Sequence, residues 1–124
     1  MKKILIVEDH ADIRRLIRMT LEFEGCQIHE APDAPTGWDL VRELQPDAVL
    51  LDVMMPGALN GLDLCRAIKG DGRLRRIPVV ILSARGSAAD REAGMLAGAD
   101  AYLLKPFSPM QLLDLLSNLG VTGS

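Results

Sequence analysis

This 124-residue sequence has few cysteines, no excess of basic charge and no long apolar run. Its two cysteines, Cys26 and Cys65, have neither CxxC nor metal-ligand spacing, so we expect buried free thiols and a reducing, cytoplasmic location. The formal net charge is -3, which argues against direct binding of nucleic acid, because phosphate contacts need a basic surface. The first apolar run, residues 4–7, is too short for a signal peptide or a membrane span.

The composition that remains is typical of one globular domain. Hydrophobic residues make up 48% and charged residues 25% of the chain, which excludes disordered and fibrous classes. No repeat or low-complexity segment interrupts the sequence. We therefore expect one domain over residues 1–120 and interpret residues 121–124 as a C-terminal tail or the start of a linker.

Short apolar runs alternate with helical patterns along the chain. Four runs rich in Val, Ile and Leu are typical of strands buried on both faces of a parallel sheet, and a fifth run is weaker. The four are residues 4–7, 48–51, 79–82 and 101–104, and the weaker run is 27–31. An amphipathic pattern follows each run, the last one opening with a capping box at Ser108. Five successive βα units predict an α/β domain with helices on both faces of a parallel sheet.

The fourth helical pattern has the thinnest apolar stripe. Its predicted core residues are Ala89, Ala93, Leu96 and Ala97. Gly94 lies inside this pattern and costs about 1 kcal/mol relative to alanine in a helix interior. We expect this helix to be the least firmly held, which would suit a switch surface, although a packing need for a small residue explains Gly94 equally well.

Polar residues follow the four strongest runs. Glu8 and Asp9 follow the first, and Asp52, Ser83 and Lys105 follow the runs at 48–51, 79–82 and 101–104. Parallel strands bring these endings to one edge of the sheet, where ligands of open α/β sheets bind. Each residue alone has a structural interpretation, such as a helix cap at Asp9, a turn at Ser83 or an exposed strand end at Lys105. Their convergence favours a common site.

The types of these residues indicate phosphoryl chemistry. Three clustered carboxylates repel one another, and a divalent cation such as Mg²⁺, which prefers carboxylate, water and phosphate oxygens, removes that cost. Zinc is disfavoured because His10 and His29 have no ligand spacing with a cysteine. Lys105 adds positive charge for an anion, and Ser83 can donate a hydrogen bond to it. Asp52 is therefore the candidate acceptor of a phosphoryl group.

Four segments, in order, are ILIVEDH, LLDVMMPG, PVVILSA and GADAYLLKPF. Together they resemble the receiver domain of bacterial two-component response regulators, over essentially the whole chain. The resemblance implies a flavodoxin-like (βα)5 fold, with a doubly wound five-stranded parallel sheet in the order 2-1-3-4-5 of the chemotaxis-type receiver. It also implies a phosphorelay module that takes a phosphoryl group from a histidine kinase or phosphotransfer protein and switches its partner-binding face.

The resemblance assigns a role to each candidate residue. Asp52 becomes the phosphoacceptor, Lys105 and Ser83 contact the phosphoryl group, and Ser83 with Tyr102 forms the switch. Mg²⁺ is expected on Asp9, Asp52 and the backbone carbonyl of Met54, with Glu8 bound through water. The peptide between Lys105 and Pro106 is expected to be cis.

Three departures from the family pattern are visible. The loop from Gly57 to Gly61 carries one extra residue, whose effect on phosphorylation and dephosphorylation rates stays open. His10 directly follows the acid pair, and we expect an exposed first-turn residue rather than a metal ligand. The last helix has no arginine or lysine, which argues against charge-paired dimerisation. We expect a monomer or weak dimer without membrane contact, and the output partner or fused output domain is unknown.

Two other functions stay open. A phosphohydrolase acting through an aspartyl phosphate would need a second acid two residues after Asp52, where the sequence has Met54. A docking module independent of phosphate is disfavoured because every member of the constellation is present. We therefore expect no turnover enzyme, only self-catalysed phosphorylation and slow autodephosphorylation.

Overall fold

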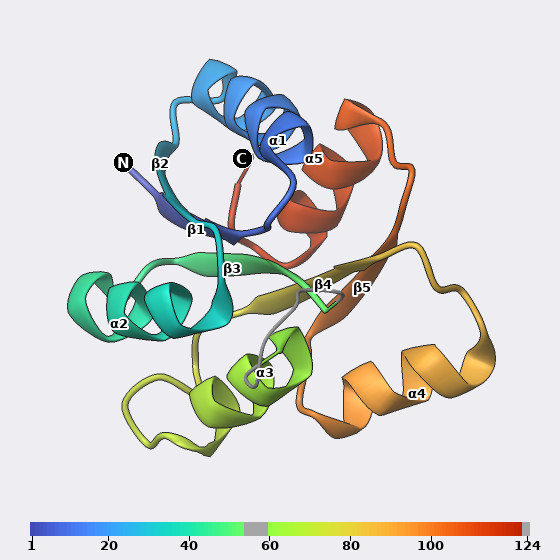
Figure 1. Cartoon of the computed structure of the whole chain (residues 1–124). Coiled ribbons are helices and arrows are strands. Elements are labelled where there is room, and N and C mark those ends of the chain that lie inside the picture. The colour runs from blue at the N-terminus through green and yellow to red at the C-terminus, as the bar shows by residue number, and fades with distance from the viewer. Residues whose placement is uncertain (54–59, 123–124) are drawn as a thin grey trace.

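The computed structural model describes residues 1–53 and 60–122. Within them, strands and helices alternate from β1 to α5 (Figure 1). Their bounds are β1 (Lys3–Val7), α1 (Ala11–Phe23), β2 (Gln27–Ala31), α2 (Ala34–Leu44), β3 (Ala48–Asp52), α3 (Gly61–Gly70), β4 (Val79–Ser83), α4 (Ala88–Leu96), β5 (Ala101–Leu104) and α5 (Pro109–Asn118). None of the described helices is long and apolar enough to cross a membrane.

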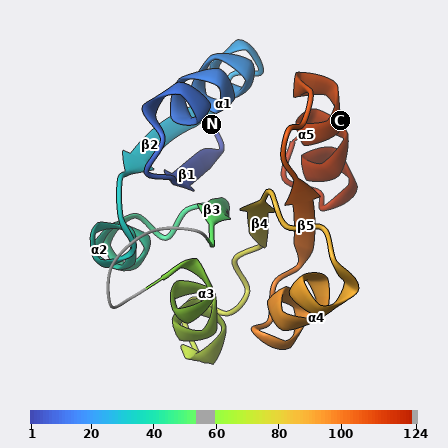
Figure 2. The same cartoon turned by 45° about the vertical axis from the view of Figure 1, so that its right-hand side comes forward.

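The strands form a parallel sheet in the order β2-β1-β3-β4-β5, which confirms the predicted fold class and strand order. β1 pairs with both β2 and β3, and the later strands add outward on the β3 side. Figure 1 shows α1 and α5 on one face of the sheet and α2, α3 and α4 on the other. In the second view, β4 and β5 lie between α5 above and α3 and α4 below (Figure 2).

Side chains of the strands point alternately to the two faces, because successive residues of a strand face opposite ways. Leu5 and Leu51 pack on the side of α2, α3 and α4, whereas Ile6 and Leu50 pack on the side of α1 and α5. Both faces are covered by helices, so these strands are apolar throughout. A continuous apolar run in the sequence therefore indicates a parallel strand that is buried on both faces.

Side chains at the N-termini of four helices cap free backbone N–H groups. The capping oxygens belong to Asp33, Asn60, Ser87 and Ser108, and each accepts from the N–H three residues on. The capping box predicted at Ser108 is confirmed. The alternative that Asp9 caps α1 is wrong, because the N-cap of α1 is His10 and its side chain makes no capping hydrogen bond.

The core face of α4 differs from the predicted stripe. Leu96 is 81% exposed and Ala89 is exposed as well, while Gly94 and Ala97 are buried. A β-carbon on Gly94 would lie 2.9 Å from Ile81 Cδ1 and 3.2 Å from a ring carbon of Tyr102. The helix therefore turns its smallest residue toward the sheet, and an apolar-periodicity pattern cannot register glycine as a core residue.

Candidate functional site

The register of the sheet brings the polar strand endings together. Val7 pairs with Leu51, Asp52 with Leu82, and Ser83 with Leu104, so these strands end at nearly the same level. Backbone hydrogen bonds continue the alignment, since the N–H of Lys105 donates to the carbonyl of Ser83 at 2.7 Å. The candidate residues after β1 and at the ends of β3, β4 and β5 consequently share one edge.

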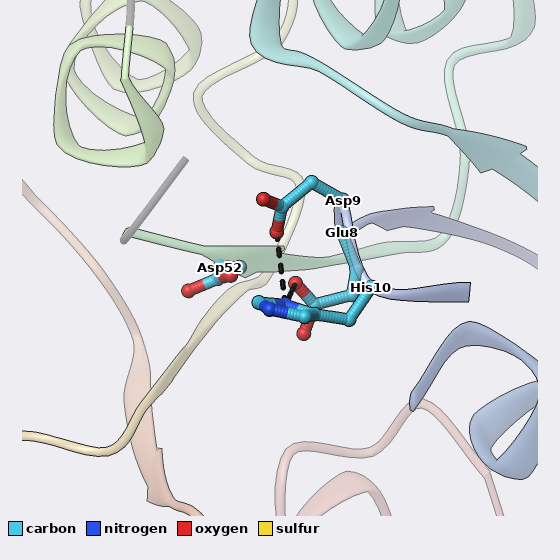
Figure 3. A group of neighbouring side chains, drawn as sticks. All are labelled: Glu8, Asp9, His10 and Asp52. Carbon is cyan, nitrogen blue, oxygen red and sulfur yellow. Dashed lines mark ion pairs between the residues drawn. The ribbon is translucent and has the colours of Figure 1, made fainter. Parts of the chain in front are cut away.

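Glu8, Asp9 and Asp52 form an acidic cluster at this edge. One ligand atom of each, together with one of His10, lies within 4.8 Å of the others (Figure 3). Glu8 and Asp52 are fully buried, and Glu8 Oε2 and Asp9 Oδ1 accept no hydrogen bond from the described residues. Buried carboxylate oxygens left in this way are the donors that a hard divalent cation binds. The residues present therefore fit Mg²⁺.

Lys105 supplies positive charge to the cluster. Its Nζ donates a hydrogen bond to Glu8 Oε1 at 2.5 Å and lies 3.5 Å from Asp52 Oδ2. The side chain is only 15% exposed. Lys105 therefore points into the site, and the alternative of an exposed strand end is wrong.

The protonation of Glu8 reflects this environment. Burial, and after it the neighbouring Asp52 carboxyl, raises the pKa of Glu8 to about 7, against the opposing effect of the Lys105 ammonium. Burial disfavours the charged carboxylate because it removes water from around the charge. A cation bound among these oxygens would favour the ionised form.

Ser83 and Tyr102 meet at the backbone of Arg85. The Oγ of buried Ser83 accepts a hydrogen bond from the Arg85 N–H at 3.0 Å, and the Tyr102 hydroxyl donates to the Arg85 carbonyl at 2.5 Å. The Arg91 guanidinium lies 5.4 Å from the centroid of the Tyr102 ring. The two residues expected to form the switch are thus joined through one intervening residue.

Two further expected features of the site are the Met54 carbonyl and the cis peptide between Lys105 and Pro106. Met54, whose carbonyl is an expected metal ligand, lies outside the described residues, as does the loop with the extra residue apart from Asn60 and Gly61. The peptide between Lys105 and Pro106 is cis, as expected. A β-carbon on Gly61 would collide with the carbonyl oxygen of Asp52, so glycine is required where α3 begins beside Asp52.

Arg14 is a site residue that no motif indicated. Its Nη1 donates to the main-chain carbonyl of Glu8 at 2.6 Å, and its Nε donates to Glu30 Oε1 at 3.1 Å. Arg18 holds the same carboxylate at 2.7 Å from the next turn of α1. The turn that carries Glu8 and Asp9 is therefore tied to α1 and β2. The sequence shows only an arginine on the polar side of a helix, with no signal for this contact.

The model of the response regulator receiver domain family matches residues 4–117. The chain belongs to this family. It is 44% identical over 112 residues to the phosphate regulon transcriptional regulatory protein PhoB of Klebsiella pneumoniae, covering 90% of this chain and 48% of that protein. It is 42% identical over 111 residues to the response regulator MprA of Mycobacterium tuberculosis, covering 90% and 47%. The receiver thus spans about half the length of these curated relatives.

Solved structures place the fold among receiver domains. The chemotaxis protein CheY4 of Vibrio cholerae matches with a TM-score of 0.89 and 28% identity, covering 95% of this chain and 98% of that one. The receiver domain of the sensor histidine kinase PA1611 of Pseudomonas aeruginosa, with magnesium in its active-site cleft, matches with a TM-score of 0.86 and 30% identity, covering 94% and 96%. The magnesium site of the PA1611 receiver is consistent with the acidic cluster of this chain.

Proposed function

We propose that this receiver accepts a phosphoryl group on Asp52 from the phosphohistidine of a histidine kinase or phosphotransfer protein. The observation that carries the proposal is the position of Asp52, which is buried at the sheet edge among two further carboxylates and 3.5 Å from the Lys105 ammonium. Such a carboxylate is held in place, shielded from bulk water and flanked by positive charge.

The metal in this proposal is Mg²⁺. Asp9 and Asp52 are proposed as direct ligands and Glu8 as a ligand through water, with the Met54 carbonyl as a further expected ligand. When bound, Mg²⁺ supplies positive charge that stabilises the oxygens of a transferring phosphoryl group. The support in this chain is the cluster of carboxylate oxygens within 4.8 Å, of which Glu8 Oε2 and Asp9 Oδ1 lack hydrogen bonds from the described residues.

Asp52, Lys105 and Ser83 have separate roles in the proposed phosphoryl transfer. A carboxylate oxygen of Asp52 forms the new bond to phosphorus, the bond from phosphorus to the donor imidazole breaks, and its electron pair stays on the imidazole nitrogen. Lys105 neutralises charge on the phosphoryl oxygens, for which its Nζ is already 3.5 Å from Asp52 Oδ2. Ser83 donates its hydroxyl proton to a phosphoryl oxygen in a hydrogen bond.

Switching follows from the contacts around Arg85. In this structure Ser83 Oγ accepts a hydrogen bond from the Arg85 N–H. A phosphoryl group that accepts a hydrogen bond from the Ser83 hydroxyl would alter this contact between Ser83 and the Arg85 backbone. The Arg85 carbonyl in turn accepts from Tyr102, which lies on β5. We propose that aspartyl phosphate biases Tyr102 between two positions and so alters the face that a partner or an output domain reads.

We propose a signalling module rather than a turnover enzyme. The residue two positions after Asp52 is Met54, which cannot transfer the proton that a phosphohydrolase needs from its second acid. The receiver would catalyse only its own phosphorylation and a slow autodephosphorylation.

Intact-protein mass spectrometry tests the proposed function. The protein is incubated with Mg²⁺ and a small acyl phosphate, and we expect a gain of one phosphoryl group that Asp52→Asn abolishes. Asp114→Asn, which changes an exposed carboxylate on α5, is the matched control and should label as the unaltered protein does. Rapid multiple turnover of phosphomonoesters would instead favour a phosphohydrolase, and no labelling from any donor would favour a docking module.

A further inference from the structure

His10 turns its ring toward the acidic cluster. As the N-cap residue of α1 it has extended backbone angles, yet its side chain makes no capping hydrogen bond. Its Nδ1 lies 3.1 Å from Asp9 Oδ1 and 3.5 Å from Glu8 Oε2, although the side chain is 62% exposed. Figure 3 shows the imidazole beside the carboxylates of Glu8 and Asp9 and near Asp52. The expectation of an exposed residue is correct, but the ring nitrogen lies at the metal site.

A buried carboxylate oxygen independently marks this spot as a ligand position. Glu8 Oε2 has no exposed surface to hydrate it and accepts no hydrogen bond within the described part of the chain. The other oxygen of the same carboxylate is held by Lys105, which fixes its orientation. Four residues can each present one ligand atom to this spot, and these atoms lie within 4.8 Å of one another: His10, Glu8, Asp9 and Asp52.

We propose that His10 adds a nitrogen ligand to the metal site. With this ligand, the preference of the site for borderline divalent ions such as Ni²⁺ and Co²⁺ over Mg²⁺ is stronger than it would be with carboxylate ligands alone. The inference rests on the metal site of the proposed function. Mg²⁺ is a hard ion that selects oxygen, whereas imidazole suits nickel, cobalt and zinc. At equal concentrations, a site with this ligand set would bind the borderline ion more tightly than Mg²⁺.

A second interpretation of the same distances makes the opposite prediction. If the imidazole were only a positive partner of Glu8 and Asp9, it would compete with every cation, and its removal would strengthen Mg²⁺ and Ni²⁺ binding alike. A ligand role makes removal of His10 weaken Ni²⁺ selectively. The sign of the effect on Ni²⁺ thus separates the two interpretations.

Calorimetric titration of the full chain with Ni²⁺ and, separately, with Mg²⁺ tests the inference. We expect His10→Ala to lower Ni²⁺ affinity by about tenfold or more while leaving Mg²⁺ affinity nearly unchanged. His29→Ala is the matched control, since His29 lies on β2, contacts Gln27 and is not part of the acidic cluster. Unchanged or increased Ni²⁺ affinity in His10→Ala overturns the inference.

Proton NMR of the Co²⁺ form gives a readout of ligation itself. We expect a paramagnetically shifted imidazole N–H signal that disappears in His10→Ala and persists in His29→Ala; its persistence in His10→Ala contradicts the proposed ligand. The Mg²⁺ site of the proposed function and the His10 ligand can be tested separately. Absence of Mg²⁺ binding in the unaltered protein removes the metal of the proposed function, whereas Mg²⁺ binding with no His10 effect removes this inference alone.

Discussion

Glu8 is a fully buried carboxylate whose ionisation depends on its neighbours. Burial and Asp52 raise its pKa to about 7 from an ordinary 4.5. Between these values the folded state keeps a proton that the unfolded state has released, so Glu8 contributes stability that is complete below pH 4.5 and lost as the pH rises through 7. In the presence of a chelator, we expect the melting temperature to fall as the pH rises from about 4.5 to about 7 and to change little from this group above that range.

The matched variant for this prediction is Glu8→Gln, which cannot ionise and keeps a similar shape. Its melting temperature, followed by circular dichroism, should change less over the same pH interval. An equally steep decrease in Glu8→Gln would show that another group is responsible.

Cys65 is a buried thiol with no part in the proposed chemistry. Burial raises its pKa to about 11, and its Sγ donates to the Ala97 carbonyl at 3.5 Å. Because the thiolate is the reactive form, we expect Cys65 to remain unmodified by a disulfide reagent at about pH 8 in native Cys26→Ala protein. Absorbance of the released thiol should appear only after unfolding in denaturant. Rapid stoichiometric labelling of the native variant would contradict this description.

At the scale of the secondary-structure elements, α4 packs through Gly94. An added methyl group there would approach Ile81 of β4 and the ring of Tyr102, so the helix needs a residue without a side chain. Alanine improves helix propensity by about 1 kcal/mol, but overpacking a core costs about 1–3 kcal/mol. We expect Gly94→Ala to lower the free energy of unfolding, measured by urea denaturation.

Gly70 provides the control for this substitution. It is the last residue of α3, and a β-carbon there meets nothing within 4 Å. Gly70→Ala should therefore be neutral or stabilising. If Gly94→Ala proved as stable as Gly70→Ala, close packing between α4 and Tyr102 would not be what requires the glycine.

The elements also show what the sequence could predict. The five strand predictions agree with the structure to within one residue at each end. The signal was clearest for β1, β3 and β4, which are buried almost throughout and apolar along the predicted runs, whereas β2 contains polar residues. The predicted stripe of α4 was wrong at Ala89 and Leu96, because the helix packs through Gly94, which carries no apolar side chain for a pattern to detect. His10 and Arg14 could not be assigned from sequence, since their contacts depend on how side chains turn around the end of β1.

At the scale of the whole molecule, two apolar layers hold the parallel strands in one register, and that register assembles the site. Asp52 and Lys105 are far apart in sequence and meet because β3, β4 and β5 end at nearly the same level. Convergence of strand ends was therefore enough to predict which residues gather. It could not predict that Lys105 would hydrogen-bond Glu8 more closely than it approaches Asp52.

The central claim is that Asp52 itself carries the phosphoryl group. Borohydride reduces an aspartyl phosphate to homoserine, so phosphorylated protein can be reduced, digested and sequenced by mass spectrometry. The account predicts homoserine at position 52, dependent on Mg²⁺ and on the acyl phosphate, and unmodified Asp9 in the same digest. Reduction at Asp9 or Glu8 in place of Asp52, or phosphorylated protein with no reduced residue at position 52, would contradict it.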